Sequence, residues 1–186
     1  PGFSMFYLNP NEDTNGLTLD FPGSGHLWLA PLMINPLSPM SAYLGGGGIN
    51  GGNHLIKLTY SNNSINNSIT YNEDPYNFNS TISALGFSNF DHSSRYVLTD
   101  NGYFYYSDDN GASWNQSNTF TGLEPQYFYG STIHSLNNTN EVVLIGGSGY
   151  SNSPIYISYN NGETFSSFSD GIPNTLVYDL CGTDDD

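Results

Sequence analysis

The stretch Tyr105-Tyr106-Ser107-Asp108-Asp109-Asn110-Gly111-Ala112-Ser113-Trp114 reads as a strand, a tight turn and a second strand. An Asp side chain accepts hydrogen bonds from nearby backbone N–H groups, so Asp109 is expected to hold the turn. Asn110 and Gly111 tolerate the positive φ angles of tight turns. Trp114 then begins the return strand and offers a large apolar surface to cover the hairpin. The stretch therefore predicts a β-hairpin corner organised by its own polar side chains.

A second stretch repeats the pattern as Ser158-Tyr159-Asn160-Asn161-Gly162-Glu163-Thr164-Phe165, a separation of 51 residues from Ser107 to Ser158. Asn160 takes the place of the aspartate, and Phe165 takes the place of the tryptophan. Both replacements keep the chemistry, because asparagine also caps turns and phenylalanine also packs. This period suits a repeat fold in which each unit is a blade of four antiparallel strands.

The shared order of Ser, Asp or Asn, Gly, Ser or Thr, and Trp or Phe resembles the Asp box of the BNR-repeat β-propellers. That family includes sialidases, sortilin-type receptors, xyloglucanase-like glycosidases and photosystem assembly factors. The resemblance implies that the box lies at the blade periphery, on the face away from the substrate, and is structural. Its residues here are Ser107, Asp109, Gly111, Trp114, Ser158, Asn160, Gly162 and Phe165.

Apolar segments separated by turns rich in Asn, Gly, Pro and Ser divide the chain into units of four strands, and no stretch shows helical periodicity. The expected blades are 28–72, 82–120 and 131–169. Residues 1–25 read as a hairpin from a preceding partial blade, and 175–186 read as the start of a following one. The predicted fold class is therefore all-β, a single partial β-propeller domain with about three four-stranded antiparallel blades.

Three complete blades are too few for a ring, since propellers of the resembling family usually have about six to eight blades, and closure removes exposed sheet edges. The chain begins at Pro1 without Met or a signal peptide, so a fragment or a processed form of a longer propeller is expected. The remaining blades would come from the same or another chain. The segment from Gly171 to Leu180 also resembles blade junctions in very large bacterial propeller proteins exported by the type IX route.

Only 10% of the 186 residues are charged, and the formal net charge is −15, because Lys57 and Arg95 are the only fixed cations beside 17 carboxylates. Nucleic acids and anionic membranes bind through clustered Lys and Arg, so neither is an expected partner. No apolar run of about 18 residues occurs, so membrane insertion is not expected. Polarity carried by Asn, Ser, Thr and Tyr is common in secreted bacterial β proteins. A secreted or cell-surface location is therefore expected.

The single cysteine, Cys181, excludes an internal disulfide, and its apolar neighbours Val177, Tyr178 and Leu180 predict a small buried strand residue instead of a reactive thiol. The four histidines are too dispersed for a metal motif, and His134 is expected to be a hydrogen-bonded core residue. The corner carboxylates lack the alternating ligands and closing Glu of a calcium loop. No metal and no cofactor is therefore expected.

The resemblance places function on the opposite face from the corners, in loops that carry Glu73, Asp74, Asp100 and Glu124. A glycosidase needs two carboxylates about 5 to 10 Å apart across the sugar, and the candidates for that role are Asp100 and Glu124. The competing interpretation is that all four are solvated loop acids. A sialidase clamps its substrate with an arginine triad, and one arginine, Arg95, excludes a complete sialidase from this chain alone.

Aromatic residues near the loops could form a platform for carbohydrate, since sugars stack on aromatic faces. The competing interpretation is that most of these rings pack between blades. The residues are Tyr76, Phe78, Tyr127, Phe128, Tyr129 and Tyr150.

Three functions follow from these patterns. The leading hypothesis is a non-catalytic extracellular or cell-surface module for binding or scaffolding within a larger secreted protein, with a protein or carbohydrate partner on its loop face. The alternative is a glycoside hydrolase of the xyloglucanase-like Asp-box type that acts on polysaccharide, which rests on analogy. A third possibility is an assembly factor that grips another protein through the ring face.

Overall fold

The computed structural model describes residues 4–7, 17–20, 30–47, 50–62, 67–118, 131–147 and 153–182. In these ranges the chain is all-β, as the sequence predicted, with one short 3-10 element, η1 (Asn50–Gly52). None of the described helical residues forms a helix long and apolar enough to cross a membrane. The chain divides into two compact units, Pro1–Thr81 and Ile82–Asp186.

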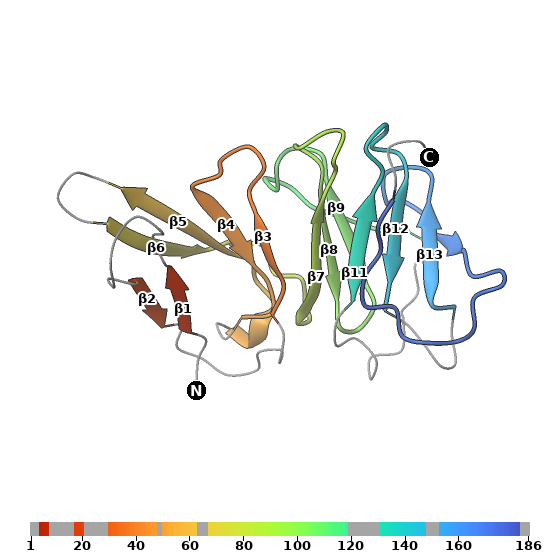
Figure 1. Cartoon of the computed structure of the whole chain (residues 1–186), viewed down its shortest axis with the longest axis horizontal. Coiled ribbons are helices and arrows are strands. Elements are labelled where there is room, and N and C mark those ends of the chain that lie inside the picture. The colour runs from red at the N-terminus through yellow and green to blue at the C-terminus, as the bar shows by residue number, and fades with distance from the viewer. Residues whose placement is uncertain are drawn as a thin grey trace. The chain divides into compact units, whose positions relative to one another are not determined.

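The first unit contains a two-stranded hairpin and a four-stranded antiparallel sheet, here called sheet 1 (Figure 1). The hairpin pairs β1 (Ser4–Tyr7) with β2 (Leu17–Asp20). Sheet 1 has the order β3-β4-β5-β6, and its buried cluster is Leu44, Ile56 and Leu58. Its strands are β3 (Leu32–Ile34), β4 (Ser41–Leu44), β5 (Ile56–Asn62) and β6 (Asn67–Glu73).

The second unit contains two further four-stranded antiparallel sheets, here called sheet 2 and sheet 3, whose first strands β7 and β11 lie side by side (Figure 1). Sheet 2 consists of β7 (Ile82–Phe87), β8 (Arg95–Thr99), β9 (Phe104–Ser107) and β10 (Asn115–Gln116). Sheet 3 consists of β11 (Thr132–Ser135), β12 (Val143–Gly146), β13 (Ile155–Ser158) and β14 (Ser166–Ser167).

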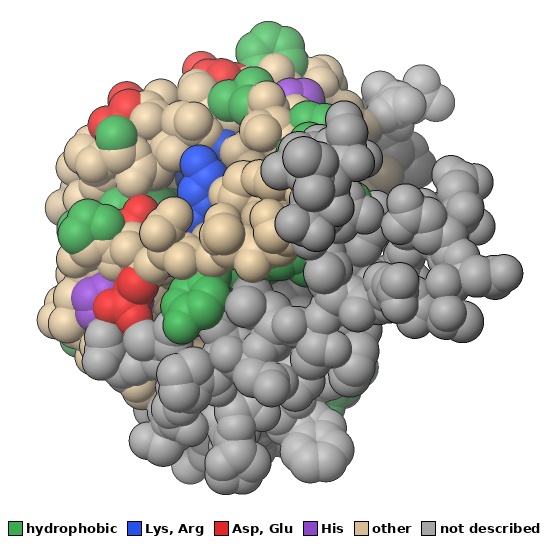
Figure 2. Space-filling model, turned by 90° about the vertical axis from the view of Figure 1, so that its left-hand side faces the viewer, with side chains coloured by type: hydrophobic (Ala, Val, Ile, Leu, Met, Phe, Trp, Pro, Cys, Tyr) green, Lys and Arg blue, Asp and Glu red, His purple; other side chains and the backbone are tan. Residues whose placement is uncertain are grey.

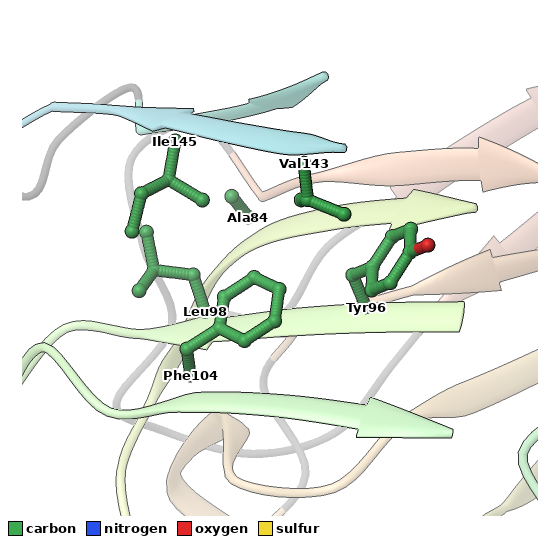
Figure 3. Close-up of a cluster of buried hydrophobic side chains, with 6 residues drawn as sticks. All are labelled: Ala84, Tyr96, Leu98, Phe104, Val143 and Ile145. Atoms are coloured by element: carbon green, nitrogen blue, oxygen red, sulfur yellow. The ribbon is translucent and has the colours of Figure 1, made fainter. Parts of the chain in front are cut away.

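The core of the second unit lies between sheet 2 and sheet 3. Strand β8 is buried along its whole length, including the polar residues Arg95 and Thr99 at its two ends. Figure 3 shows side chains from the two sheets pointing toward one another across this layer. The cluster consists of Ala84, Tyr96, Leu98 and Phe104 from sheet 2, and Val143 and Ile145 from sheet 3.

The outer strands of sheets 2 and 3 are shorter than the sequence indicated. The expected blade bounds, 82–120 and 131–169, leave room for longer fourth strands after the two corners, but β10 and β14 pair over only two residues each. Residues 119–120 lie outside the described part of the chain. Trp114 and Phe165 are the last residues of their corners and pack against neighbouring side chains. Strand pairing therefore begins at the next residue, Asn115 in β10 and Ser166 in β14.

The segment after sheet 3 differs from expectation at Cys181, whereas the partial blade expected over 175–186 stays a prediction, because 183–186 lie outside the described residues. Residues 175–182 form no strand, and Cys181 is exposed instead of buried. The segment is held by packing rather than by pairing, because Val177 lies directly against Gly146, where a Cβ atom would come within 2.7 Å of Val177 Cγ1. Further along, Gly182 passes close to the half-buried ring of His134. Cys181 therefore faces solvent.

Candidate functional site

The first corner, residues 107–114, is held by hydrogen bonds among its own side chains and backbone. Ser107 Oγ donates to Asp109 Oδ1 at 2.8 Å and accepts from the Gly111 N–H at 2.9 Å. The Asp109 carboxylate also accepts from the Ser113 N–H at 2.8 Å and from the Ser113 hydroxyl at 2.6 Å. Asn110 and Gly111 have φ angles of 64° and 86°, which explains why these residue types occur there.

The second corner, residues 158–165, repeats these bonds with an amide in place of the carboxylate. Ser158 Oγ donates to Asn160 Oδ1 at 2.9 Å and accepts from the Gly162 N–H at 2.9 Å. Asn160 Oδ1 accepts from the Thr164 N–H at 2.9 Å. Asn160 Nδ2 donates to Thr164 Oγ1 at 3.0 Å, so the amide reverses the one bond that a carboxylate can only accept.

The stability of the first corner depends on pH because Asp109 is a carboxylate. The amide of Asn160 does not titrate, so it gives the second corner no such dependence. Hydrogen bonds from Ser113, and then from Ser107, lower the pKa of Asp109 to about 2. An unfolded aspartate has a pKa of about 3.9, so the stabilisation is complete above that pH and disappears as pH falls toward 2.

We therefore expect Asp109→Asn to fold and to lose part of the acid-induced drop in melting temperature between about pH 4 and pH 2. The substitution gives the first corner the amide that already works in the second. Thermal melts of wild type and variant over this pH range would measure the effect. The reciprocal variant, Asn160→Asp, should gain acid sensitivity, and identical acid limbs in all three proteins would contradict the assignment.

Each corner also contacts the turn between the first two strands of its own sheet. The Asn110 N–H donates to the Ser93 carbonyl at 2.9 Å, and the Asn161 N–H donates to the Glu141 carbonyl at 2.8 Å. In sheet 2, Arg95 Nη2 donates to Asn110 Oδ1. Arg95 is only 3% exposed, so one of the two fixed cations serves as a buried support of the corner.

The second corner additionally joins sheet 3 to sheet 2. The Tyr96 hydroxyl of β8 donates to Asn161 Oδ1 at 2.6 Å, and the Phe165 ring meets the Phe104 ring edge-on with centroids 4.8 Å apart. Gly162 lies against the same ring, since a Cβ atom there would be 2.5 Å from Phe104 Cε1. The Glu163 carbonyl accepts from the Ser117 hydroxyl and the Asn118 N–H, both at 2.9 Å. The second corner therefore connects sheets 2 and 3 through hydrogen bonds and ring contacts.

A second link joins the first strands of these sheets. The Asn89 N–H donates to Ser135 Oγ, and Asn89 Nδ2 donates to the Ser135 carbonyl, each at 2.9 Å. Ser135 Oγ in turn donates to the Phe87 carbonyl at 3.1 Å. The two sheets are therefore fixed by directional bonds as well as by their apolar layer.

One end of sheet 1 gathers polar side chains from two loops. Strands β4 and β5 are joined there by residues 45–55, and the chain leaves β6 there through residues 74–81; we call this region the loop end of sheet 1. Asn53 Nδ2 donates to Asn77 Oδ1 at 3.0 Å, and the Phe78 N–H donates to the Asn53 carbonyl at 3.0 Å. Thr81 Oγ1 bonds the Gly51 carbonyl at 3.2 Å. These bonds fix one loop on the other.

His54 occupies the centre of the loop end. Its Nδ1 lies 2.9 Å from the Asp74 carbonyl oxygen and 4.0 Å from Glu73 Oε1. Because a carbonyl only accepts, Nδ1 carries the proton, and in the neutral ring Nε2 keeps its lone pair. The side chains of His54 and Glu73 are 14% and 27% exposed, so both are held but still reachable.

The structure describes one of the two candidate catalytic acids, Asp100. Asp100 is half-buried in the β8–β9 turn, which Thr99 Oγ1 closes by donating to Asn101 Oδ1 at 2.6 Å. Glu124 lies outside the described ranges, so its role stays a prediction. Asp74 Oδ1 caps its own turn by accepting from the Tyr76 N–H at 2.9 Å. Within the described residues, no group of three or more His, Cys, Asp and Glu side chains could hold a metal ion.

The described carboxylates visible on one face do not form a single cluster (Figure 2). Figure 2 shows carboxylates on the described part of one face as separate spots among uncharged polar side chains. Of the two interpretations of the loop aromatics, Phe78 fits packing and not the platform, because it is fully buried and packs against Tyr76 with ring centroids 4.8 Å apart. The hydrogen bond from the Phe78 N–H to the Asn53 carbonyl holds this residue in place. The other platform residues, Tyr127, Phe128, Tyr129 and Tyr150, lie outside the described ranges.

Sequence reasoning missed a recess of about 230 Å³ beside the second corner. The available signal was the replacement of tryptophan by the smaller phenylalanine at position 165, together with a tyrosine where the first corner has Asp108. The recess is lined by Ile157, Tyr159, Asn160, Thr164, Phe165 and Ser166.

No family model and no curated protein matches this sequence. Among solved structures, the chain is similar to the GH74 xyloglucanase from Xanthomonas campestris, with a TM-score of 0.51 and 13% identity over 77% of this chain and 24% of that chain. It is also similar to the GH74 enzyme of Niastella koreensis, with a TM-score of 0.48 and 18% identity over 74% of this chain and 22% of that chain. YCF48 from Cyanidioschyzon merolae gives a TM-score of 0.45 and 18% identity over 74% of this chain and 35% of that chain.

The chain thus spans about a quarter of the length of the Xanthomonas enzyme. Taken with the three four-stranded antiparallel sheets, this similarity shows that the sheets are blades of a β-propeller. At this level of identity the similarity concerns the fold alone.

Proposed function

We propose that this chain is part of a β-propeller that binds a protein or carbohydrate partner through the loop ends of its blades. In this proposal it is a non-catalytic module of a larger secreted or cell-surface protein. The observation that carries the proposal is the loop end of sheet 1, where two loops are fixed to each other and present polar groups, one of them the Glu73 carboxylate, around His54. Such preorganisation lowers the entropy lost on binding.

The chemistry of the loop end suits a ligand rich in hydroxyl groups. Asn77 offers its Nδ2 donor, since its Oδ1 already accepts from Asn53 Nδ2 and from the Asn79 N–H, and His54 offers its ring Nε2. Glu73 adds a partly exposed carboxylate that can accept from a hydroxyl. Hydroxyl groups both donate and accept, so neutral carbohydrate or a polar protein loop fits this mixture better than an anion does. The net charge of −15 further disfavours anionic ligands.

Two of the described aspartates are suited to structural roles. Hydrogen bonds from Ser93 lower the pKa of Asp91, and those from Ser113 lower the pKa of Asp109. A general acid at neutral pH needs the opposite change, a carboxyl whose pKa is raised. These aspartates are therefore suited to capping turns rather than to protonating a leaving group.

We expect the 186-residue chain to bind at least one neutral polysaccharide, with xyloglucan, mixed-linkage glucan and galactomannan as probes, and to release no reducing ends. His54→Ala and Asn77→Ala should each weaken binding at least tenfold, because each removes a group from the loop end. Affinity gel electrophoresis measures the shift. His92→Ala serves as the matched control and should bind normally, since His92 is exposed in the β7–β8 turn.

A glycoside hydrolase is the second candidate function, favoured by the fold similarity to the Xanthomonas xyloglucanase. The same preparations decide between the two. Release of reducing sugar from xyloglucan that disappears in a folded Asp100→Asn or Glu124→Gln variant would overturn the non-catalytic assignment. Binding that survives both loop-end substitutions would instead place the ligand elsewhere.

A further inference from the structure

We propose that Asn110 in the first corner is a site of self-modification, in which its side-chain amide closes onto the Gly111 nitrogen and is converted to a carboxylate. Asparagine is a chemically labile residue, and a following glycine has no side chain to hinder its backbone nitrogen. The first corner differs from comparable sites in the groups that surround the reacting atoms. The Asn-Gly pairs with described side chains are Asn101-Gly102, Asn110-Gly111 and Asn161-Gly162.

The nucleophile is the backbone nitrogen of Gly111, and its proton has a path away from it. The Gly111 N–H donates to Ser107 Oγ at 2.9 Å, and the Ser107 hydroxyl donates to Asp109 Oδ1 at 2.8 Å. Hydrogen bonds from Ser113 lower the pKa of Asp109 to about 2, so this carboxylate is ionised at neutral pH. The proton can therefore pass through the serine hydroxyl to the carboxylate and on to water.

The electrophile is the side-chain carbonyl carbon of Asn110, and a cation holds its oxygen. Arg95 Nη2 donates to Asn110 Oδ1, and Arg95 is only 3% exposed. Attack on the carbon places negative charge on this oxygen, and a guanidinium with little access to water stabilises that charge. Arg95 therefore stands where an oxyanion-stabilising group is needed.

The reaction needs no reagent other than water. A bond forms between Gly111 N and Asn110 Cγ, the Cγ–Nδ2 bond breaks, and the side-chain nitrogen leaves as ammonia with the proton that the glycine gave up. Water then opens the imide ring and leaves either aspartate or its β-linked isomer. The aspartate carboxylate would stand against the Arg95 guanidinium, and pairing a buried cation favours that product.

The other two Asn-Gly pairs lack this combination of groups. In the second corner, the Gly162 N–H also donates to a serine hydroxyl, but that hydroxyl donates to the Asn160 amide, which is no base at neutral pH. Asn161 Oδ1 accepts from a neutral tyrosine hydroxyl instead of a cation. The Gly102 N–H donates to the Thr99 carbonyl at 2.8 Å, and a carbonyl cannot relay a proton.

The test is peptide mapping by mass spectrometry of the folded chain, kept at neutral pH and physiological temperature and sampled over time. Asn110 should be converted at least about tenfold faster than Asn101 or Asn161. In concentrated urea the three residues should react at similar rates, because the unfolded chain has lost the surrounding hydrogen bonds. Similar rates in the folded chain would overturn the proposal.

Asp109→Asn should slow the conversion of Asn110 about tenfold, because it removes the proton acceptor while an amide can still close the corner. It should also change the pH profile. Conversion in wild type should vary little between about pH 5 and pH 7, whereas in the variant it should rise with hydroxide concentration. Faster conversion in Asp109→Asn would show that the reaction follows opening of the corner, and would overturn the relay.

Asp108→Asn is the matched control, because Asp108 is an exposed carboxylate of the same corner that lies outside this chain of hydrogen bonds. It should react within about twofold of wild type. Asn110→Asp imitates the product and should melt no lower than wild type, since its carboxylate meets Arg95. A lower melting temperature would contradict the fit of the product.

Discussion

Replacing Gly162 with alanine is expected to lower the free energy of unfolding by about 3 kcal/mol or more, through backbone strain and overpacking together. Gly162 has a φ angle of 89°, in the region that residues with a Cβ atom rarely adopt. The new methyl group would also stand 2.5 Å from Phe104 Cε1, and that ring is fully buried and cannot move aside. Urea denaturation followed by circular dichroism measures the loss.

Two other glycines separate strain from crowding. Gly111 has the same place in the first corner and a φ angle of 86°, but a Cβ there would be 3.4 Å from Trp114, an ordinary contact. Gly171 has a φ angle of 80° and nothing within 4 Å. Alanine at either position should cost about 1 kcal/mol, from strain alone. Equal losses at Gly162 and Gly111 would show that the second corner is not pressed against sheet 2.

Phe104→Ala is expected to have an effect of similar or larger size, about 3 to 5 kcal/mol, as is typical for a buried phenylalanine. The ring is fully buried, stacks on Tyr96 with centroids 5.8 Å apart and meets Phe165 edge-on. Its removal opens a cavity in the layer between sheets 2 and 3, where Val143 and Ile145 cannot collapse without breaking strand pairing. Equilibrium unfolding in urea gives the value.

The double variant Phe104→Ala/Gly162→Ala tests whether the two residues are coupled. The methyl group at position 162 would enter the space left by the ring, so the combined loss should fall short of the sum by at least about 1 kcal/mol. Phe78→Ala is the matched control, since Phe78 is also fully buried but belongs to the other compact unit. Its effect should add to that of Gly162→Ala. Additive losses for the Phe104 pair would rule out direct contact.

The corners could be predicted from the sequence because their interactions are local. Every bond that closes the first corner joins residues within four positions of each other, as from Ser107 to Asp109 or Gly111. Local side-chain bonds of this kind act on the chain wherever it lies in the fold. The alternation of apolar segments with polar turns likewise indicated three four-stranded antiparallel sheets, and the structure confirms that fold class.

The contacts between blades could not be predicted, because their partners are far apart in the chain. The Tyr96 hydroxyl bonds an asparagine 65 positions later, and Asn89 bonds a serine 46 positions later. Tertiary packing also decided where individual residues lie. Phe78 is drawn into the interior by a backbone bond to Asn53, and Cys181 faces solvent because its segment packs instead of pairing. No local pattern distinguishes these outcomes.

The candidate sites show the same division. Sequence reasoning found the loop that holds Asp74, but the prediction that Glu73 lies in a loop was wrong, because Glu73 is the last residue of β6 and pairs with Ile56. It did not find that His54 lies beside both acids, because the loop between β4 and β5 must first fold back onto the chain leaving β6. The recess beside Tyr159 likewise combines residues of β13, the second corner and β14, which come together only when the two strands pair.

The unequal lengths of the outermost strands affect how this protein can misassemble. A terminal strand exposes backbone donors and acceptors to which a foreign strand can add, and aggregation by that route needs a row of several residues. β10 and β14, with two residues each, offer almost no such row, whereas β6 runs for seven. Any fibril-like association should therefore begin along β6. The exposed polar side chains of Ser68, Thr70 and Asn72 oppose it, because they keep water at that edge.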